Sequence, residues 1–206
     1  MLDALKDFYQ AVSLIDLIFL IITISACSSQ VMVDSEESHS NYLSAADSLI
    51  LSRKAQDHFI KGNISDMKGN YAEAILEYQE ALQFENAAGI HYALSKNYIK
   101  LNKLSKSLSH AKDAVKISPG NIEYNFLLAR IYSMARLVDS AAIYFEEVIR
   151  LDSTNFQAYY NLGKIYESTK PRKALSIYYD LLDRTGPEWN VLVKIADLNE
   201  RIGKYT

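Results

Sequence analysis

The feature that most constrains the fold of this chain is a sequence pattern that returns every 34 residues. The pattern is a leucine followed directly by a small residue and, four positions after the leucine, by a tyrosine, and it begins at Leu94, Leu128 and Leu162. A weaker copy starts at Ala55 and has Gly62 in the place of the small residue. A fixed period of this length predicts stacked copies of one supersecondary unit, because no single copy can bury its apolar face alone.

A second motif follows in each copy, at Ala74-x-x-x-Tyr78, Ser107-x-x-x-Ala111, Ala141-x-x-x-Phe145 and Ala174-x-x-x-Tyr178. Together with the period, these residues resemble the tetratricopeptide repeat family, over Ala55 to Pro187. The resemblance implies an all-α fold, a right-handed solenoid of about four helix-turn-helix repeats with an additional C-terminal helix. We expect a helical extension at 41–54, repeats at 55–87, 88–121, 122–155 and 156–187, and a terminal helix, the start of a fifth repeat, at 188–206.

Turn residues separate the helical stretches. We expect a long first helix from about Asn41 to about Lys68 and a second helix from Tyr71 to Phe84, with a left-handed glycine at Gly69 between them. The inner turn of the last repeat is one residue short, and Pro171 should lie in the first turn of the helix that follows. The repeated leucines should fill the seam between paired helices. The small residues beside them should let the helices approach closely: Gly62, Ser95, Ala129 and Gly163.

The N-terminal segment contains an apolar run, residues 17–26, which ends directly before the single cysteine, Cys27. The run is shorter than the roughly 20 residues that span a bilayer, and it has the length of the apolar part of a signal peptide. The sequence Ile24-Ser25-Ala26-Cys27 resembles the lipobox of bacterial lipoproteins. That resemblance implies a signal segment at 1–26, lipid attachment and a membrane anchor at Cys27, a flexible tether at 27–40, and an exported, periplasm-facing location in the bacterial cell envelope.

The residues before the apolar run are acidic, with Asp3 and Asp7 against Lys6, whereas a signal peptide starts with positive charge. Two alternatives therefore stay open: an uncleaved anchor that leaves the repeats facing the cytoplasm as an adaptor, and a short apolar helix that packs on the domain.

First helices line a concave groove in the tetratricopeptide repeat family, and this resemblance places two ladders of residues there. One ladder is aromatic, formed by Phe59, Tyr92, Phe126 and Tyr160, and the other is polar, formed by Asn63, Lys96, Arg130 and Lys164. We expect these eight residues to bind a protein or peptide partner that carries carboxylates. The alternative is that the aromatic residues are spacers between repeats and that the cations are solvated or paired with nearby acids, Asp66, Glu123 and Glu167. Phe59 stands where carboxylate-clamp members of the family have a lysine, which argues against a chaperone-tail clamp.

The remaining residues predict no catalytic chemistry. His58 and His91 occupy the same position in adjacent repeats, which favours a packing role over metal binding, and no metal, phosphate-loop or nucleophile motif is present in the sequence. The net charge is -3 and no long basic run occurs, which argues against nucleic-acid binding. We therefore expect a protein-interaction scaffold that is not an enzyme and holds no cofactor; a regulatory subunit of an enzyme or transporter is the other interpretation.

The C-terminal stretch from Trp189 to Thr206 is apolar on two sides. One side carries Val191, Ile195, Leu198 and Ile202, and the other carries Trp189, Leu192, Val193 and Ala196. Since only one side can pack on the fourth repeat, we expect the other to bind a partner or a second copy of the chain, or to mark a truncated reading frame. Residues 201–205 resemble a turn between two helices.

Overall fold

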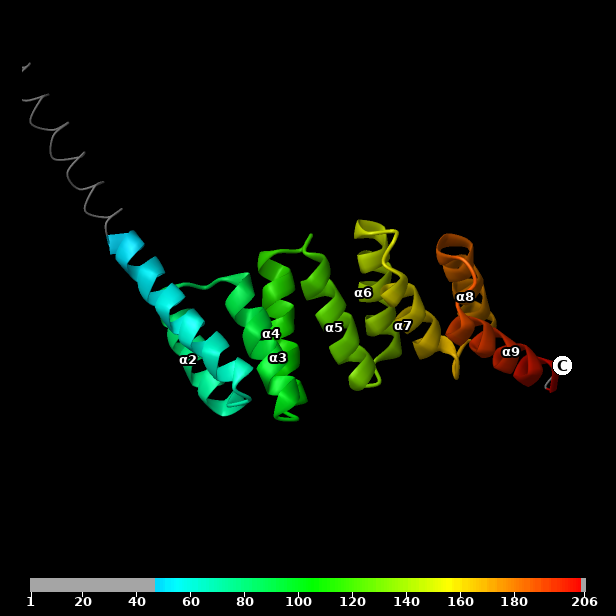
Figure 1. Ribbon diagram of the computed structural model, residues 1–206, viewed down its shortest axis with the longest axis horizontal. Helices are drawn as coiled ribbons and strands as arrows, with labels where there is room; N and C mark the ends of the chain where they lie inside the picture. Colours follow the sequence, from blue (N-terminus) through cyan, green and yellow to red (C-terminus); the bar gives the residue numbers. More distant parts are fainter. Residues whose placement is uncertain (1–46, 205–206) are drawn as a thin grey trace, which may run out of the picture. The chain divides into compact units, whose positions relative to one another are not determined.

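The computed structural model describes residues 47–204, which form helices joined by short turns (Figure 1). The chain divides into two units, residues 1–53 and 54–206. Helical residues run from 47 to 67, so the predicted end of the first helix near Lys68 is confirmed. Its predicted start, the signal segment, the tether and Cys27 lie outside the described residues. Within residues 47–204, no helix combines the length and the apolar character that crossing a bilayer requires.

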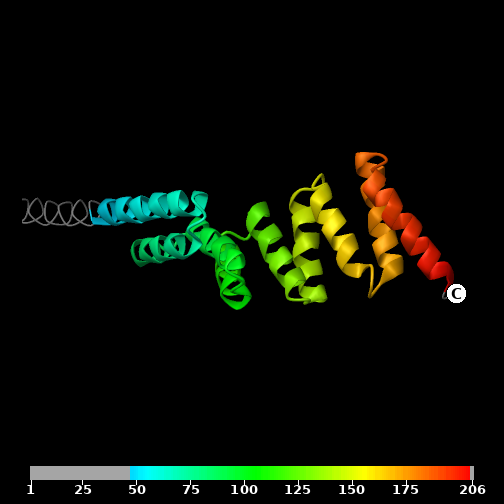
Figure 2. The same cartoon turned by 60° about the horizontal axis from the view of Figure 1, so that its bottom comes forward.

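The second unit continues with helices α2 to α9, which confirms the all-α repeat fold predicted above. Their bounds are α2 Tyr71–Phe84, α3 Ala88–Lys100, α4 Leu104–Ile117, α5 Ile122–Met134, α6 Val138–Leu151, α7 Phe156–Tyr166, α8 Pro171–Thr185 and α9 Trp189–Lys204. Each of these helices packs on the next one in the sequence, so that hairpins such as α3–α4 and α5–α6 lie side by side in chain order (Figures 1 and 2).

The turns inside the first three repeats share one geometry. Gly69, Asn102 and Arg136 hold the equivalent position, with φ of 80°, 56° and 58°, in the left-handed region. The N–H of the following residue then donates to a carbonyl five positions back, as in Lys103 to Tyr98 at 2.8 Å, which closes the helix end. The predicted left-handed Gly69 is thereby confirmed. The fourth repeat omits one residue here, and Pro171 begins α8 as predicted.

The seam between paired helices is filled as the pattern predicted, with Leu94, Leu128 and Leu162 buried. The small residues allow two kinds of close approach. A Cβ atom on Gly62 or Gly163 would lie 2.5 Å from the ring of Tyr78 or Tyr178, so only glycine fits beside these tyrosines. In the second repeat, Ser95 Oγ instead donates to the Ser107 carbonyl at 3.0 Å, and Ser107 Oγ donates to the Ser95 carbonyl at 2.9 Å.

The last helix packs with one side only. Val191, Ile195 and Leu198 are buried and join the core formed by the third and fourth repeats. Trp189 is 76% exposed, Leu192 39% and Val193 48%, so this side of α9 is uncovered within the part of the chain that the structure describes. The turn expected at residues 201–205 is wrong up to Lys204, because α9 stays helical to that residue.

Candidate functional site

The predicted aromatic ladder is half-buried and packs within the repeats. Phe59, Phe126 and Tyr160 each meet a ring from the second helix of their own repeat, at centroid distances of 5.5, 5.7 and 6.1 Å. In the second repeat the equivalent position of that helix is Ala111 and carries no ring, and Tyr92 instead lies 5.1 Å from Tyr124 of the next repeat. These residues therefore serve as spacers while part of each ring stays open to solvent.

The open parts of these rings line two cavities. The first has a volume of about 280 Å³ and is lined by Phe59, Asn63, Asp66, Tyr78, Gly89, Tyr92, Ala93, Lys96, Glu123 and Tyr124. The second has a volume of about 350 Å³ and is lined by Tyr92, Lys96, Ile122, Glu123, Phe126, Leu127, Arg130, Asn155 and Gln157. Tyr92 and Lys96 belong to both, so six of the eight predicted groove residues lie around two adjoining cavities.

Two cations of the groove, Lys96 and Arg130, make no ion pair among the described residues. Lys96 Nζ lies 5.2 Å from the centroid of the Tyr92 ring. Across residues 47–204, neither Lys96 nor Arg130 has a carboxylate oxygen within ion-pair distance. Burial raises the pKa of Tyr92, the charge of Glu123 raises it further, and Arg130 acts in the opposite direction. A carboxylate and a guanidinium thus both act on this ring, and the local charge is mixed.

The acids predicted to pair with the groove cations, and the cation Lys164, lie in different surroundings. Glu167 accepts a hydrogen bond from the Tyr178 hydroxyl at 2.6 Å and an ion pair from Lys194 at 3.1 Å, so its carboxylate is already engaged. Lys164, the last cation of the ladder, is exposed on α7 and is not among the residues that line the three cavities described in this section. Asp66 lines the first cavity, and its charge adds to the effect of burial in raising the pKa of Tyr78.

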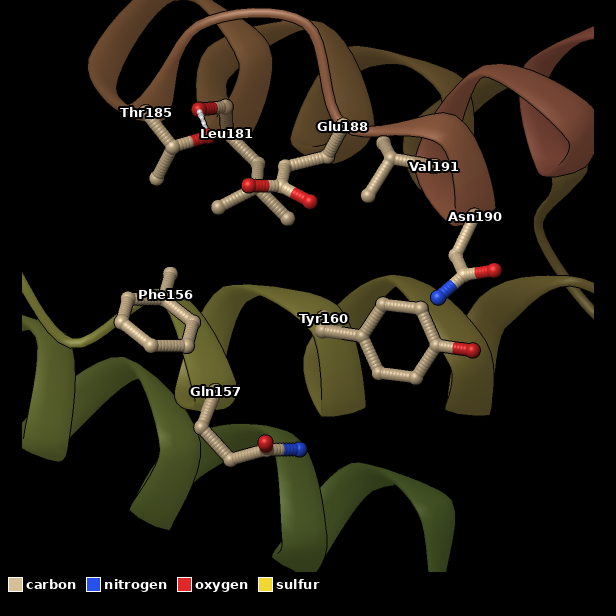
Figure 3. A pocket seen from close by; sticks show the side chains of 8 residues that line it. All are labelled: Phe156, Gln157, Tyr160, Leu181, Thr185, Glu188, Asn190 and Val191. Atoms are coloured by element: carbon tan, nitrogen blue, oxygen red, sulfur yellow. Dashed lines mark hydrogen bonds between the residues drawn. The ribbon is translucent and has the colours of Figure 1, made fainter.

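A third and larger cavity, of about 620 Å³, lies between α7, α8 and the start of α9 (Figure 3). It is lined by Phe156, Gln157, Tyr160, Leu181, Thr185, Glu188, Asn190 and Val191. In Figure 3, Phe156 and Tyr160 face Leu181 and Val191 across the open space. Of this set, sequence reasoning found only Tyr160. A further first helix was predicted at 188–206, but only its packing in the structure shows that Asn190 and Val191 line this cavity.

Known proteins resemble the chain in sequence and in fold. No family model matches the sequence. Tetratricopeptide repeat protein 8 of Mus musculus is 31% identical over 108 residues, which cover 52% of this chain and 21% of that protein. The chain spans about a fifth or less of the curated relatives that it matches.

Two solved structures show the same fold. A crystal structure of the MamA protein superimposes with a TM-score of 0.69 and 21% identity, over 73% of this chain and 83% of that one. YrrB, described as a TPR protein with an unusual peptide-binding site, superimposes with a TM-score of 0.61 and 24% identity, over 67% and 72%. The chain therefore has the fold of tetratricopeptide repeat proteins.

In a tetratricopeptide repeat protein, equivalent residues of successive first helices recur along one surface, and here they line cavities with aromatic walls. Such a surface can stack on apolar side chains and pair with carboxylates.

Proposed function

We propose that this tetratricopeptide repeat protein is a non-catalytic scaffold that binds an extended segment of a partner protein along its first helices. The observation that carries the proposal is the pair Lys96 and Arg130, which line one cavity with Phe126 and have no ion-pair partner among residues 47–204. An unpaired cation beside an open aromatic ring suits a carboxylate carried on an apolar segment. The peptide-binding site in the description of YrrB supports the same use of the fold.

The chemistry of the cavities narrows the partner segment. Glu123 lines both smaller cavities together with Lys96, so a dense run of acidic residues would be repelled there. The 620 Å³ cavity has apolar walls from Phe156, Leu181 and Val191 and a polar rim that includes Glu188. We therefore propose a segment with one or two carboxylates between apolar or aromatic side chains, rather than a polyacidic tail.

A peptide-binding measurement tests the proposal. Nine-residue peptides selected on the full chain from a display library would be synthesised, and their Kd measured by fluorescence anisotropy at low and high salt. Lys96→Ala and Arg130→Ala should each weaken binding about 5- to 20-fold, as expected when a hydrogen bond to a charged group worth about 1.5 kcal/mol is lost. The loss should shrink at high salt because screening weakens the exposed pair.

Lys112→Ala is the matched control, because Lys112 also lies over a tyrosine ring, Tyr132 at 5.7 Å, but on a second helix. This variant should bind as wild type does. Equal affinities for wild type, Lys96→Ala and Arg130→Ala would refute the groove assignment.

The finer part of the proposal is that the scaffold is a lipoprotein tethered by Cys27 and facing the periplasm, where it contributes to assembly of an envelope complex. Support comes from the lipobox-like Ile24–Cys27, which lies outside the described residues. Labelled palmitate should be incorporated into wild type and lost in Cys27→Ser. Absence of label from wild type would favour the cytoplasm-facing adaptor with an uncleaved anchor, which the acidic Asp3 and Asp7 suit better.

We propose further that the uncovered side of α9 mediates self-association. Trp189 and Leu192 lie on that side, and a neighbouring copy would remove them from water. Light scattering should show a larger species for wild type than for Trp189→Ser/Leu192→Ser. Leu76→Ser, which changes an exposed leucine on α2, should leave the mass unchanged. A wild type that stays monomeric at high protein concentration would contradict this assignment.

A further inference from the structure

The second repeat contains a pair of histidines that touch across the seam between α3 and α4. Nδ1 of His91, which is 8% exposed, lies 3.0 Å from Nδ1 of His110, and the ring centroids are 5.2 Å apart. Asp113 follows His110 by three residues on α4, and its Oδ2 atom lies 3.8 Å from His91 Nδ1. One ligand atom from each of these residues falls within 4.8 Å of the other two.

We propose that His91, His110 and Asp113 bind a divalent transition-metal ion of the zinc class. Two imidazole nitrogens and a carboxylate oxygen are ordinary zinc ligands, and water can take the fourth position. With zinc–nitrogen bonds of about 2.0–2.1 Å, two ligand atoms of a tetrahedron lie roughly 3.3 Å apart. The nitrogen pair already meets that separation within a few tenths of an ångström. Asp113 has to move closer, and its side chain is 47% exposed, so it has room to rotate.

A fourth residue, Asn86, fixes the tautomer of His91 that metal binding requires. The Asn86 Oδ1 atom lies 2.7 Å from His91 Nε2, and an amide oxygen only accepts, so Nε2 carries the proton. The lone pair of His91 is then on Nδ1 and points toward His110 and Asp113. A hydrogen bond to the far nitrogen of a ligating histidine is the usual support of metal sites, since it holds the ring and its tautomer in place.

The state of His110 differs before and after metal binding. Without metal, His110 Nδ1–H donates to the His91 lone pair across the 3.0 Å contact. To bind metal, His110 moves its proton to Nε2 through solvent, which leaves Nδ1 free and releases no proton overall.

The first repeat has only one histidine where the second repeat has the pair His91 and His110. His58 holds the position of His91, and its partner 19 residues later is Glu77, with Nδ1 and Oε2 2.8 Å apart. That pair joins a single imidazole to one carboxylate. The second repeat replaces the glutamate by His110, so a second imidazole joins the first. Lys106, which lies over the Tyr98 ring that stacks on His110, adds a positive charge nearby and favours micromolar rather than tighter affinity.

Metal titration of the EDTA-treated full-length chain tests the inference. Zn²⁺ in a calorimeter should give one site per chain with micromolar Kd, and Co²⁺ should give the visible absorption of a tetrahedral site. Both signals should disappear in His110→Gln, which keeps a polar side chain in the seam but supplies neither an imidazole nor a carboxylate ligand. Asn86→Ala should weaken binding by about tenfold, since it removes the support of His91 only. His58→Gln, the control in the first repeat, should bind as wild type does.

Zinc should also raise the Tm of wild type but not that of His110→Gln, because a ligand that binds only the folded state stabilises it. Absence of binding heat and of Co²⁺ absorption in wild type would overturn the proposal. So would an unchanged Kd in His110→Gln, since the metal would then sit elsewhere on the chain. Either result would leave the histidine pair as packing alone.

Discussion

Replacement of Gly163 by alanine tests the close packing on which the repeats depend. A Cβ atom at position 163 would lie 2.5 Å from Cε1, 2.7 Å from Cζ and 2.9 Å from Cδ1 of Tyr178. Carbon atoms in contact prefer about 3.5–4.0 Å, so the ring must withdraw by about 1 Å. The Tyr178 side chain is fully buried, and its hydroxyl donates to Glu167 at 2.6 Å, so the ring is held at both ends.

Three contributions set the magnitude of this change. Overpacking of a core costs about 1–3 kcal/mol. Withdrawal of the ring weakens the hydrogen bond to the Glu167 carboxylate, worth about 1.5–3 kcal/mol. Alanine gains about 1 kcal/mol over glycine inside a helix. We expect Gly163→Ala to lower the free energy of unfolding by about 2–3 kcal/mol, measured by urea denaturation with far-ultraviolet circular dichroism.

Two further variants make the result diagnostic. Gly89→Ala is the control, because its Cβ would meet only the Tyr124 hydroxyl at 3.8 Å, and it should be neutral or stabilising. The double variant Gly163→Ala/Tyr178→Phe copies the buried pair Ala129 and Phe145 of the third repeat. Freed from Glu167, the ring can shift, so the double variant should lose at least about 1 kcal/mol less than the sum of the single variants. If Gly163→Ala were as stable as wild type, the seam would be looser than these distances require and the reasoning would fail.

Three smaller predictions concern other buried or strained positions. Burial raises the pKa of Tyr78 to about 12 from 10.0, so this tyrosine ionises at a lower pH in the unfolded chain than in the folded one. Its contribution to stability should be complete below pH 10 and should be lost between pH 10 and 12. Tyr78→Phe should flatten that loss in urea midpoints measured across the range. Ser95→Ala and Ser107→Ala should each cost about 1 kcal/mol, because each removes one buried hydroxyl that donates to a backbone carbonyl across the seam. Unchanged urea midpoints in both variants would contradict this. Arg136→Gly should raise the thermal midpoint and the free energy of unfolding, the latter by up to about 1 kcal/mol, because arginine is strained at φ 58° where the first repeat has Gly69. A lower midpoint would show that the arginine side chain has a stabilising contact.

Some residues of the candidate site were predicted from the repeat pattern, and others were missed. The repeat positions led to Phe59, Tyr92, Phe126 and Arg130, and the structure brings these residues to the walls of two adjoining cavities. Whether they bind a peptide stays a prediction. The 620 Å³ cavity and the histidine cluster were missed, because both depend on residues from different helices that no spacing rule connects. His91 and His110 are 19 residues apart, and sequence reasoning assigned His91 to packing alone.

Local signals in the sequence were enough to place several helix ends, because turn residues and apolar periodicity act on the backbone locally. Tyr71–Phe84 and the start of α8 at Pro171 followed from these signals, as did the burial of one side of α9. Only the tertiary structure decided which side chains meet across the seams, since that depends on how closely each pair of helices approaches. A glycine beside a tyrosine, two serines that exchange hydrogen bonds and two histidines in contact all fill equivalent seams, and their sizes and polar atoms become specific only once the helices are stacked.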